Sequence, residues 1–126
     1  MHKKRKSFIN SKYDEHIIEE LKKLPKPLKT FDNHQVFFDN DKRKETIYEH
    51  IANKKHRLHT IDIKQIQTIL LNEECLKNDR NGKKNRSYVG KRIKQKERNK
   101  YLKIVTTVNK NKTESVVTIC TVKRNI

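Results

Sequence analysis

Histidines and basic side chains are the residues of this 126-residue chain whose types and spacing could do chemistry. His50, His56 and His59 stand close together, in a chain with 32 Lys and Arg against 15 Asp and Glu. An imidazole exchanges protons near neutral pH, so it can take a proton from one oxygen and give it to another. Neighbouring cations stabilise charge developing on a phosphate. This combination predicts metal-independent RNA cleavage, in which a ribose 2′-hydroxyl attacks its own phosphate.

Other site chemistries find less support in the sequence. The acids are scattered rather than clustered for two-metal cleavage. Gly82 and Gly90 are the only glycines, so the chain has no P-loop or dinucleotide-binding loop. A histidine metal site is disfavoured, because His50 and His56 are six residues apart and do not share a helix face. We expect no metal and no cofactor, and the alternative for these histidines is a solvent-facing or structural role.

The net charge of +17 predicts a polyanionic partner, with RNA as the first candidate. Between residues 77 and 112 there are fourteen Lys or Arg and two acids. A solvated basic face and a tyrosine at the core edge are the alternative interpretations of this stretch. The candidate nucleic-acid contacts in it are Lys83, Lys84, Arg86, Tyr88, Lys91, Arg92 and Lys94.

Chain length predicts one domain with a modest core. We expect residues 1–10 to be a basic flexible arm and residues 11–126 a single α+β nuclease-like domain. No apolar run approaches the ~18 residues of a membrane helix, and the start lacks the apolar region of a secretory signal. Cys75 and Cys120 fit neither a zinc ribbon nor a redox motif. These features predict a cytoplasmic protein with reduced thiols and no membrane partner.

Apolar periodicity and capping residues predict helices in the first part of the chain. Ser11 is the expected cap of the first helix, and Pro25 ends it. Asp62 is the expected cap of the third helix, and a turn at residues 39–41 caps the second. The expected helices cover residues 11–24, 47–52 and 62–72, a short strand covers residues 34–38, and residues 58–61 are ambiguous.

Three runs with strong β preference follow: Ser87–Ile93, Tyr101–Val108 and Ser115–Val122. In the second run, Leu102 and Ile104 share one face, whereas Lys103 lies on the other. Helices followed by a meander predict an α+β fold, with N-terminal helices packed on one face of a roughly four-stranded antiparallel sheet. The other face stays open and carries lysine and threonine.

Several segments in this order resemble a known group of nucleases. They are His50–His56, a helix ending at Leu71-Asn72, a strand with Tyr88, Tyr101-Leu-Lys-Ile-Val105 and Val116-Val-Thr-Ile-Cys120. The chain resembles, over roughly residues 45–123, the phage- and mobile-element-borne nuclease domains of the barnase–EndoU–colicin–RelE superfamily. It departs from the pattern where Glu73 replaces a common proline and Ile119-Cys120 replaces Ala-Tyr.

The resemblance implies a RelE/barnase-like fold and a toxin-type endoribonuclease that leaves a cyclic phosphate, with transfer RNA among the targets. Carried over by position, His50 or His56 is the acid–base residue and Lys103 steadies the phosphate. Thr118 and Tyr88 then line the site. Some members of the group are held by an acidic cognate inhibitor, which the resemblance makes an expected partner.

Two other classes of function stay open. The first is a non-catalytic, basic nucleic-acid-binding regulator of a phage or mobile element, which the charge supports equally well. The second is a phage-encoded interaction protein that inhibits host machinery. Only the histidines and Lys103 favour the enzyme, and the sequence leaves open which histidine acts.

Overall fold

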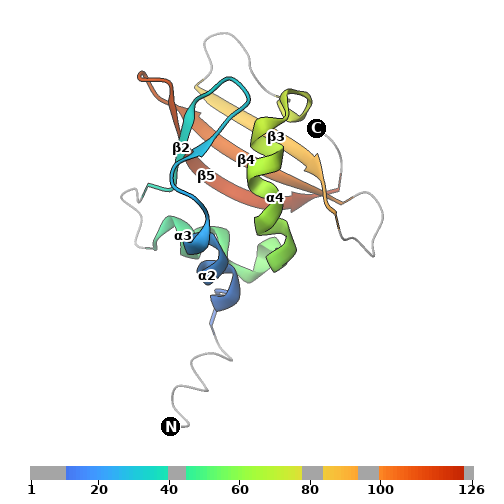
Figure 1. Cartoon of the computed structure of the whole chain (residues 1–126). Coiled ribbons are helices and arrows are strands. Elements are labelled where there is room, and N and C mark those ends of the chain that lie inside the picture. The colour runs from blue at the N-terminus through green and yellow to red at the C-terminus, as the bar shows by residue number, and fades with distance from the viewer. Residues whose placement is uncertain (1–10, 40–44, 78–83, 94–99, 124–126) are drawn as a thin grey trace.

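The computed structural model describes residues 11–39, 45–77, 84–93 and 100–123. The expected N-terminal arm, Lys83 and Lys94 lie outside these residues. Helices come first and most of the sheet follows, as Figure 1 shows. In chain order the elements are α2 Glu15–Lys23, β1 Leu28–Lys29, β2 Gln35–Phe37, α3 Ile47–Ile51, η1 Lys54–His56, α4 Thr60–Leu71, η2 Glu73–Cys75, β3 Asn85–Lys91, β4 Tyr101–Val108 and β5 Thr113–Val122.

The sheet is strongly curled, has five strands and runs in the order β1-β2-β5-β4-β3. The α+β class is confirmed, but the expected four antiparallel strands are a mixed set of five, because β2 pairs with β5 in parallel. The extra strand is β1, which pairs with β2 and places the fully buried Leu28 beside Val36. A two-residue strand has too short a run to show the alternation by which strands are recognised.

Alternation along β4 sets the two faces of the sheet. Leu102, Ile104 and Thr106 are buried on the face that the helices cover, whereas Lys103 and Val105 are half-exposed on the other. The predicted bounds of β4 are confirmed. Each of the other two late strands begins two residues before its predicted start.

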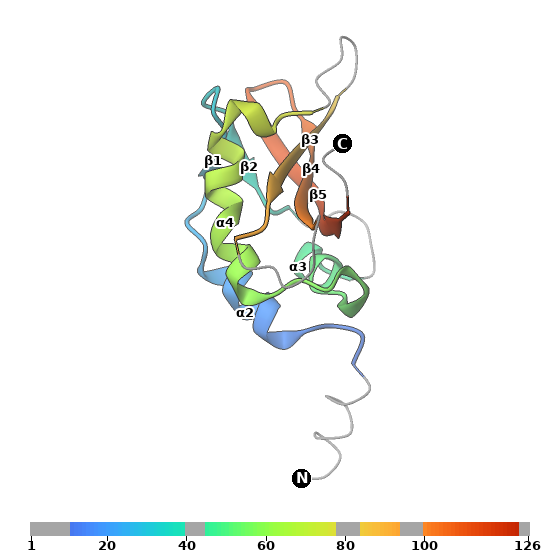
Figure 2. The ribbon, with the colours of Figure 1, turned by 90° about the vertical axis from the view of Figure 1, so that its right-hand side faces the viewer.

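Helix α4 covers one face of the sheet, and α2 and α3 gather at one end of the molecule (Figure 2). Ile66 and Leu70 of α4 are fully buried. Gly90 on β3 lies so close to α4 that an added Cβ would be 2.6 Å from Cγ1 of Ile69. A larger residue there would push α4 off the strand, so this glycine sets how tightly the helix packs.

The structure corrects the predicted helix caps. Asp14, not Ser11, caps α2 and accepts the backbone N–H of His16. Thr46 caps α3 in a reciprocal capping box with Glu49. The third helix begins two residues before Asp62, which lies inside its first turn.

No helix among the described ranges is both long and apolar enough to cross a membrane.

Candidate active site

His50 and His56 are in contact, with ring centroids 5.6 Å apart and ring planes at 77°. They lie on different elements, α3 and η1, and the chain turns at Ala52 between them. The backbone N–H of Asp14 donates to the carbonyl of Ala52 and holds that turn. A separation of six residues therefore does bring the two imidazoles together, although it would keep them apart on one straight helix. We call these two residues the histidine pair.

Each ring of the histidine pair has its Nδ1 atom beside an oxygen. Nδ1 of His56 lies 2.9 Å from the backbone carbonyl of Ile51, and Nδ1 of His50 lies 3.2 Å from Oε1 of Glu45. A carbonyl and an ionised carboxylate can only accept, so both Nδ1 atoms carry the proton. In each neutral ring Nε2 is then the nitrogen that accepts a proton.

The histidine pair is fastened to the last strand of the sheet. The hydroxyl of Thr121 on β5 donates to the backbone carbonyl of His56 at 3.0 Å. Thr118 precedes Thr121 by three residues on the same strand, which is about 10 Å of extended chain. Thr121 is opposite Leu102 in the β4–β5 register, and Leu102 is buried on the helix-covered face, so the histidine pair adjoins β5 on that face.

Lys103 and Thr118 lie on the sheet face that is not covered by α4. Lys103 is opposite Cys120 and Val105 is opposite Thr118 in the β4–β5 register, which makes Lys103 and Thr118 diagonal neighbours. Such neighbours are about 7–8 Å apart, within reach of a long side chain. A register shift after Val105 leaves Val117 as the extra residue of β5. We call Lys103 and Thr118 the lysine–threonine pair.

The predicted catalytic residues thus form two pairs rather than one bonded cluster. Among the described residues, no hydrogen bond or ion pair joins the histidine pair to Lys103 or Thr118. Both pairs adjoin β5, but on opposite faces of the sheet, because Thr118 faces away from the helices whereas Thr121, which holds the loop of His56, faces them. Their catalytic roles stay predictions.

Cys120 lies directly across from Lys103 in the β4–β5 register. Burial raises the pKa of the Cys120 thiol, and the positive charge of Lys103 lowers it by less. The charge of Lys103 therefore acts on the thiol of its cross-strand partner.

Arg86 and Tyr88, two predicted nucleic-acid contacts, are buried in an ion-pair network. Nη1 of Arg86 lies 3.0 Å from Oε2 of Glu114, and its Nη2 lies 2.9 Å from Oδ2 of Asp32. The Tyr88 hydroxyl donates to Oε1 of Glu114 at 2.9 Å. These interactions raise the pKa of Arg86, although burial alone would lower it. Neither side chain is a surface contact for a base or phosphate.

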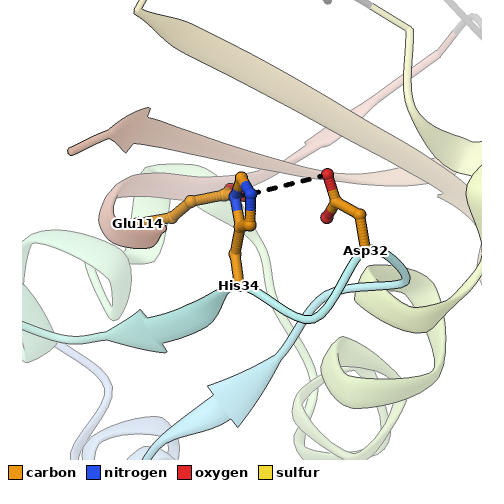
Figure 3. Close-up of side chains that lie close together, drawn as sticks. All are labelled: Asp32, His34 and Glu114. Atoms are coloured by element: carbon orange, nitrogen blue, oxygen red, sulfur yellow. Dashed lines mark hydrogen bonds and ion pairs between the residues drawn. The ribbon is translucent and has the colours of Figure 1, made fainter. Parts of the chain in front are cut away.

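Glu114 is the centre of this network and is fully buried. Its carboxylate also accepts from the hydroxyl of Thr106 at 2.6 Å and lies 2.8 Å from Nδ1 of His34. Figure 3 shows the ring of His34 between Glu114 and Asp32, whose Oδ2 is 3.7 Å from Nε2. We call Asp32, His34, Arg86, Tyr88, Thr106 and Glu114 the buried network, in which Asp32 and His34 lie at the solvent-exposed edge.

Asp32, His34 and Glu114 have ligand atoms within 4.8 Å of one another and so could in principle hold a metal ion. The guanidinium of Arg86 already contacts both carboxylates and compensates their charge. Burial raises the pKa of Asp32, but hydrogen bonds from Arg86 and Thr30 outweigh it and lower the value to about 2. A cation would have to displace Arg86, and the arrangement fits a structural ion-pair network better than a metal centre.

Arg92 is a third predicted contact whose side chain is buried. Its Nε and Nη2 atoms lie 2.8 and 2.7 Å from the two carboxylate oxygens of Asp62, which is fully buried. Asp62 also accepts the backbone N–H of His59 at the start of α4. The pair ties α4 to the end of β3, so Arg92 has a structural partner instead of a phosphate. Lys84 and Lys91 are exposed, and their contacts with nucleic acid stay predictions.

The sequence reasoning missed Glu114 and Asp32, which it counted among scattered acids. A signal for Glu114 was present, because it occupies an inward position in the alternation of β5, in step with Val116. An acid at such a position requires a buried partner. Nothing in the sequence indicates that Asp32 belongs to the same network.

Comparisons with protein-family models, curated proteins and solved structures find no match to this chain. What the structure supports of the resemblance is an α+β fold with N-terminal helices and a curled five-stranded mixed sheet.

Proposed function

We propose that this protein is a metal-independent endoribonuclease of toxin type, which cleaves RNA through attack of a ribose 2′-hydroxyl on the adjacent phosphate. The observation that carries the proposal is the contact between His50 and His56, with both Nδ1 atoms engaged. Two imidazoles in contact supply a base and an acid at one place, and both take or give the proton at Nε2.

The reaction needs one neutral and one protonated histidine. The neutral ring takes the 2′-hydroxyl proton as the 2′-oxygen bonds to phosphorus. The protonated ring gives a proton to the 5′-oxygen as the bond from phosphorus to that oxygen breaks. The products are a 2′,3′-cyclic phosphate and a 5′-hydroxyl end, and no water or metal enters this step.

The lysine–threonine pair is assigned to the phosphate. The ammonium of Lys103 would stabilise the negative charge that builds on the non-bridging oxygens, and the hydroxyl of Thr118 would donate to one of them. Thr121 and Thr118 are three residues apart on β5 and face opposite sides of the sheet, so RNA that contacts both pairs would have to pass around the end or edge of β5.

The chain's charge supplies affinity for the RNA backbone. With a net charge of +17 and exposed lysines such as Lys84 and Lys91, binding is expected to weaken steeply with salt. The same charge suits an acidic inhibitor protein as a partner.

The test is incubation of purified protein with total RNA in excess chelator, followed by analysis of the new ends. We expect cyclic phosphate ends from the wild type and about a 10²–10⁴-fold slower reaction from His56→Ala, with salt-dependent RNA affinity retained. His16→Ala is the matched control, because His16 is exposed on α2.

Two results would contradict the proposal. Intact RNA that is nevertheless bound in a salt-dependent way would favour the non-catalytic regulator. RNA affinity that barely changes with salt would favour the interaction protein instead.

A further inference from the structure

Three separate segments meet at the carboxylate of Glu45. Oε1 lies 3.2 Å from Nδ1 of His50, and Oε2 accepts the hydroxyl of Tyr13 at 2.7 Å. Tyr13 lies before α2 and forms a β-bridge with Asn53, in the turn between the two histidines. Glu45 stands just before the Thr46 cap of α3. The contact thus ties the start of the described chain to the histidine pair.

The carboxylate has one oxygen for each of these two donors. An ionised carboxylate accepts hydrogen bonds and donates none, so both Tyr13 and His50 must present a proton to it. The raised pKa of Tyr13, caused first by its hydrogen bond to Glu45, is consistent with a neutral phenol that donates. The hydroxyl bonds Oε2, and the imidazole lies beside Oε1.

We propose that Glu45 is a positioning residue for His50 and that Tyr13 holds Glu45 in place. Glu45 keeps the proton of neutral His50 on Nδ1 and aims Nε2 at the substrate, and its negative charge compensates the imidazolium. His56 differs, since its Nδ1 faces the uncharged carbonyl of Ile51. His50 is therefore the ring suited to act as the acid, and His56 the ring suited to act as the base.

The consequence for catalysis rests on the proposed function, whereas the position of the proton on His50 can be measured in the protein alone. The readout is the ¹⁵N chemical shift of the two His50 ring nitrogens, measured at a pH where the ring is neutral. Wild type is expected to show a protonated Nδ1. Glu45→Ala removes the acceptor, so the proton should redistribute toward Nε2.

Glu45→Gln tests the charge, because the amide keeps an acceptor oxygen for His50 but is not ionised. The Tyr13 hydroxyl can accept from the NH₂ group, so the amide oxygen can face His50 and the Nδ1–H form should be kept. Tyr13→Phe tests the second part of the proposal, because it removes the hydroxyl that holds Oε2. In this variant His50 should shift part of the way toward the Nε2–H form, and less than in Glu45→Ala.

Glu19→Gln is the matched control, since Glu19 is exposed on α2. It should leave the His50 signals unchanged. Thermal unfolding monitored by circular dichroism checks that each variant is folded. An unchanged Nδ1–H signal in folded Glu45→Ala would overturn the inference, and an unchanged signal in folded Tyr13→Phe would overturn the role of Tyr13.

Cleavage kinetics then separate this inference from the proposed function. If the enzyme cleaves RNA, Glu45→Ala should lower kcat by about tenfold to a hundredfold with little change in KM, less than His50→Ala does. An equal loss in KM would point to a binding role and count against positioning. If wild type cleaves no RNA, the proposed function fails while the ¹⁵N readout still decides the role of Glu45.

Discussion

The molecule builds a tyrosine–glutamate–histidine arrangement twice, once at its surface and once in its interior. Tyr13, Glu45 and His50 are half-exposed beside His56, whereas the buried network holds Tyr88 and His34 around Glu114, which is fully buried. The difference is the surroundings. In the interior, Arg86 and Thr106 also bond the carboxylate.

This difference separates a structural from a chemical use of the same side chains. Removing one partner of a buried ion pair leaves an uncompensated charge, so variants that break the buried network destabilise the fold. At the surface, water can solvate the charged forms, so the groups can gain and lose protons at little cost to folding. The comparison predicts that variants of the buried network lose stability and that variants of the histidine pair lose activity.

The largest stability effect is expected from Glu114→Ala. It leaves the buried Arg86 without one of its two carboxylate partners, which should cost about 3–5 kcal/mol of unfolding free energy. Urea denaturation measures this cost, with Glu74→Ala on the exposed side of η2 as the control. A loss below about 1 kcal/mol would mean that the network does not hold the sheet together.

The largest activity effect is expected from His56→Ala and His50→Ala. Each should slow cleavage by about 10²–10⁴-fold, while the unfolding free energy changes by no more than about 1 kcal/mol. Parallel kinetics and urea denaturation of one preparation measure both quantities. Loss of stability comparable to that of Glu114→Ala would erase the contrast between the two regions.

A smaller activity effect is expected from Lys103→Ala. Loss of the ammonium beside Thr118 should slow cleavage by about tenfold to a hundredfold, and Lys103→Arg should restore part of the rate because the charge returns. Lys110→Ala, an exposed lysine at the β4–β5 turn, is the control for net charge. If Lys103→Ala and Lys110→Ala slowed cleavage equally, Lys103 would contribute only through the net charge of the protein.

The smallest effect concerns pH and Asp32. Its pKa is about 2 in the folded protein and about 3.9 in an unfolded chain, so its stabilising effect is present above pH 4 and is lost as the pH falls toward 2. The side chain is partly exposed, which limits that effect to about 1–2 kcal/mol. Asp32→Asn should therefore be less stable than wild type at pH 6 and equal to it near pH 2. A difference that persists at pH 2 would assign the effect to packing.

The sequence predicted elements whose signal is local. The alternation of β-branched residues located β4 with its two faces, and apolar spacing located α4. The prediction was wrong for Arg86 and Arg92, because basic residues in a basic stretch were expected to be exposed. Their partners Glu114, Asp32 and Asp62 are distant in the chain, and only the folded sheet brings them together.

The candidate site was predicted as a set of residue types, not as an arrangement. The contact of His50 with His56 depends on the turn at Ala52 and on the anchor from Thr121, and neither shows as a pattern. The contact between Glu45 and His50 was missed for a similar reason, because Glu45 precedes the Thr46 cap of a five-residue helix and no sequence pattern marks it.

The most direct test of the central claim uses the nucleophile that the claim requires. An RNA cleavage site is first mapped with wild-type protein in excess chelator, and the same RNA is then made with a single 2′-deoxy substitution at the scissile nucleotide. The account predicts that cleavage at that site stops while binding is unchanged. Cleavage of the substituted RNA at the wild-type rate would contradict it, because no 2′-hydroxyl would remain to attack the phosphate.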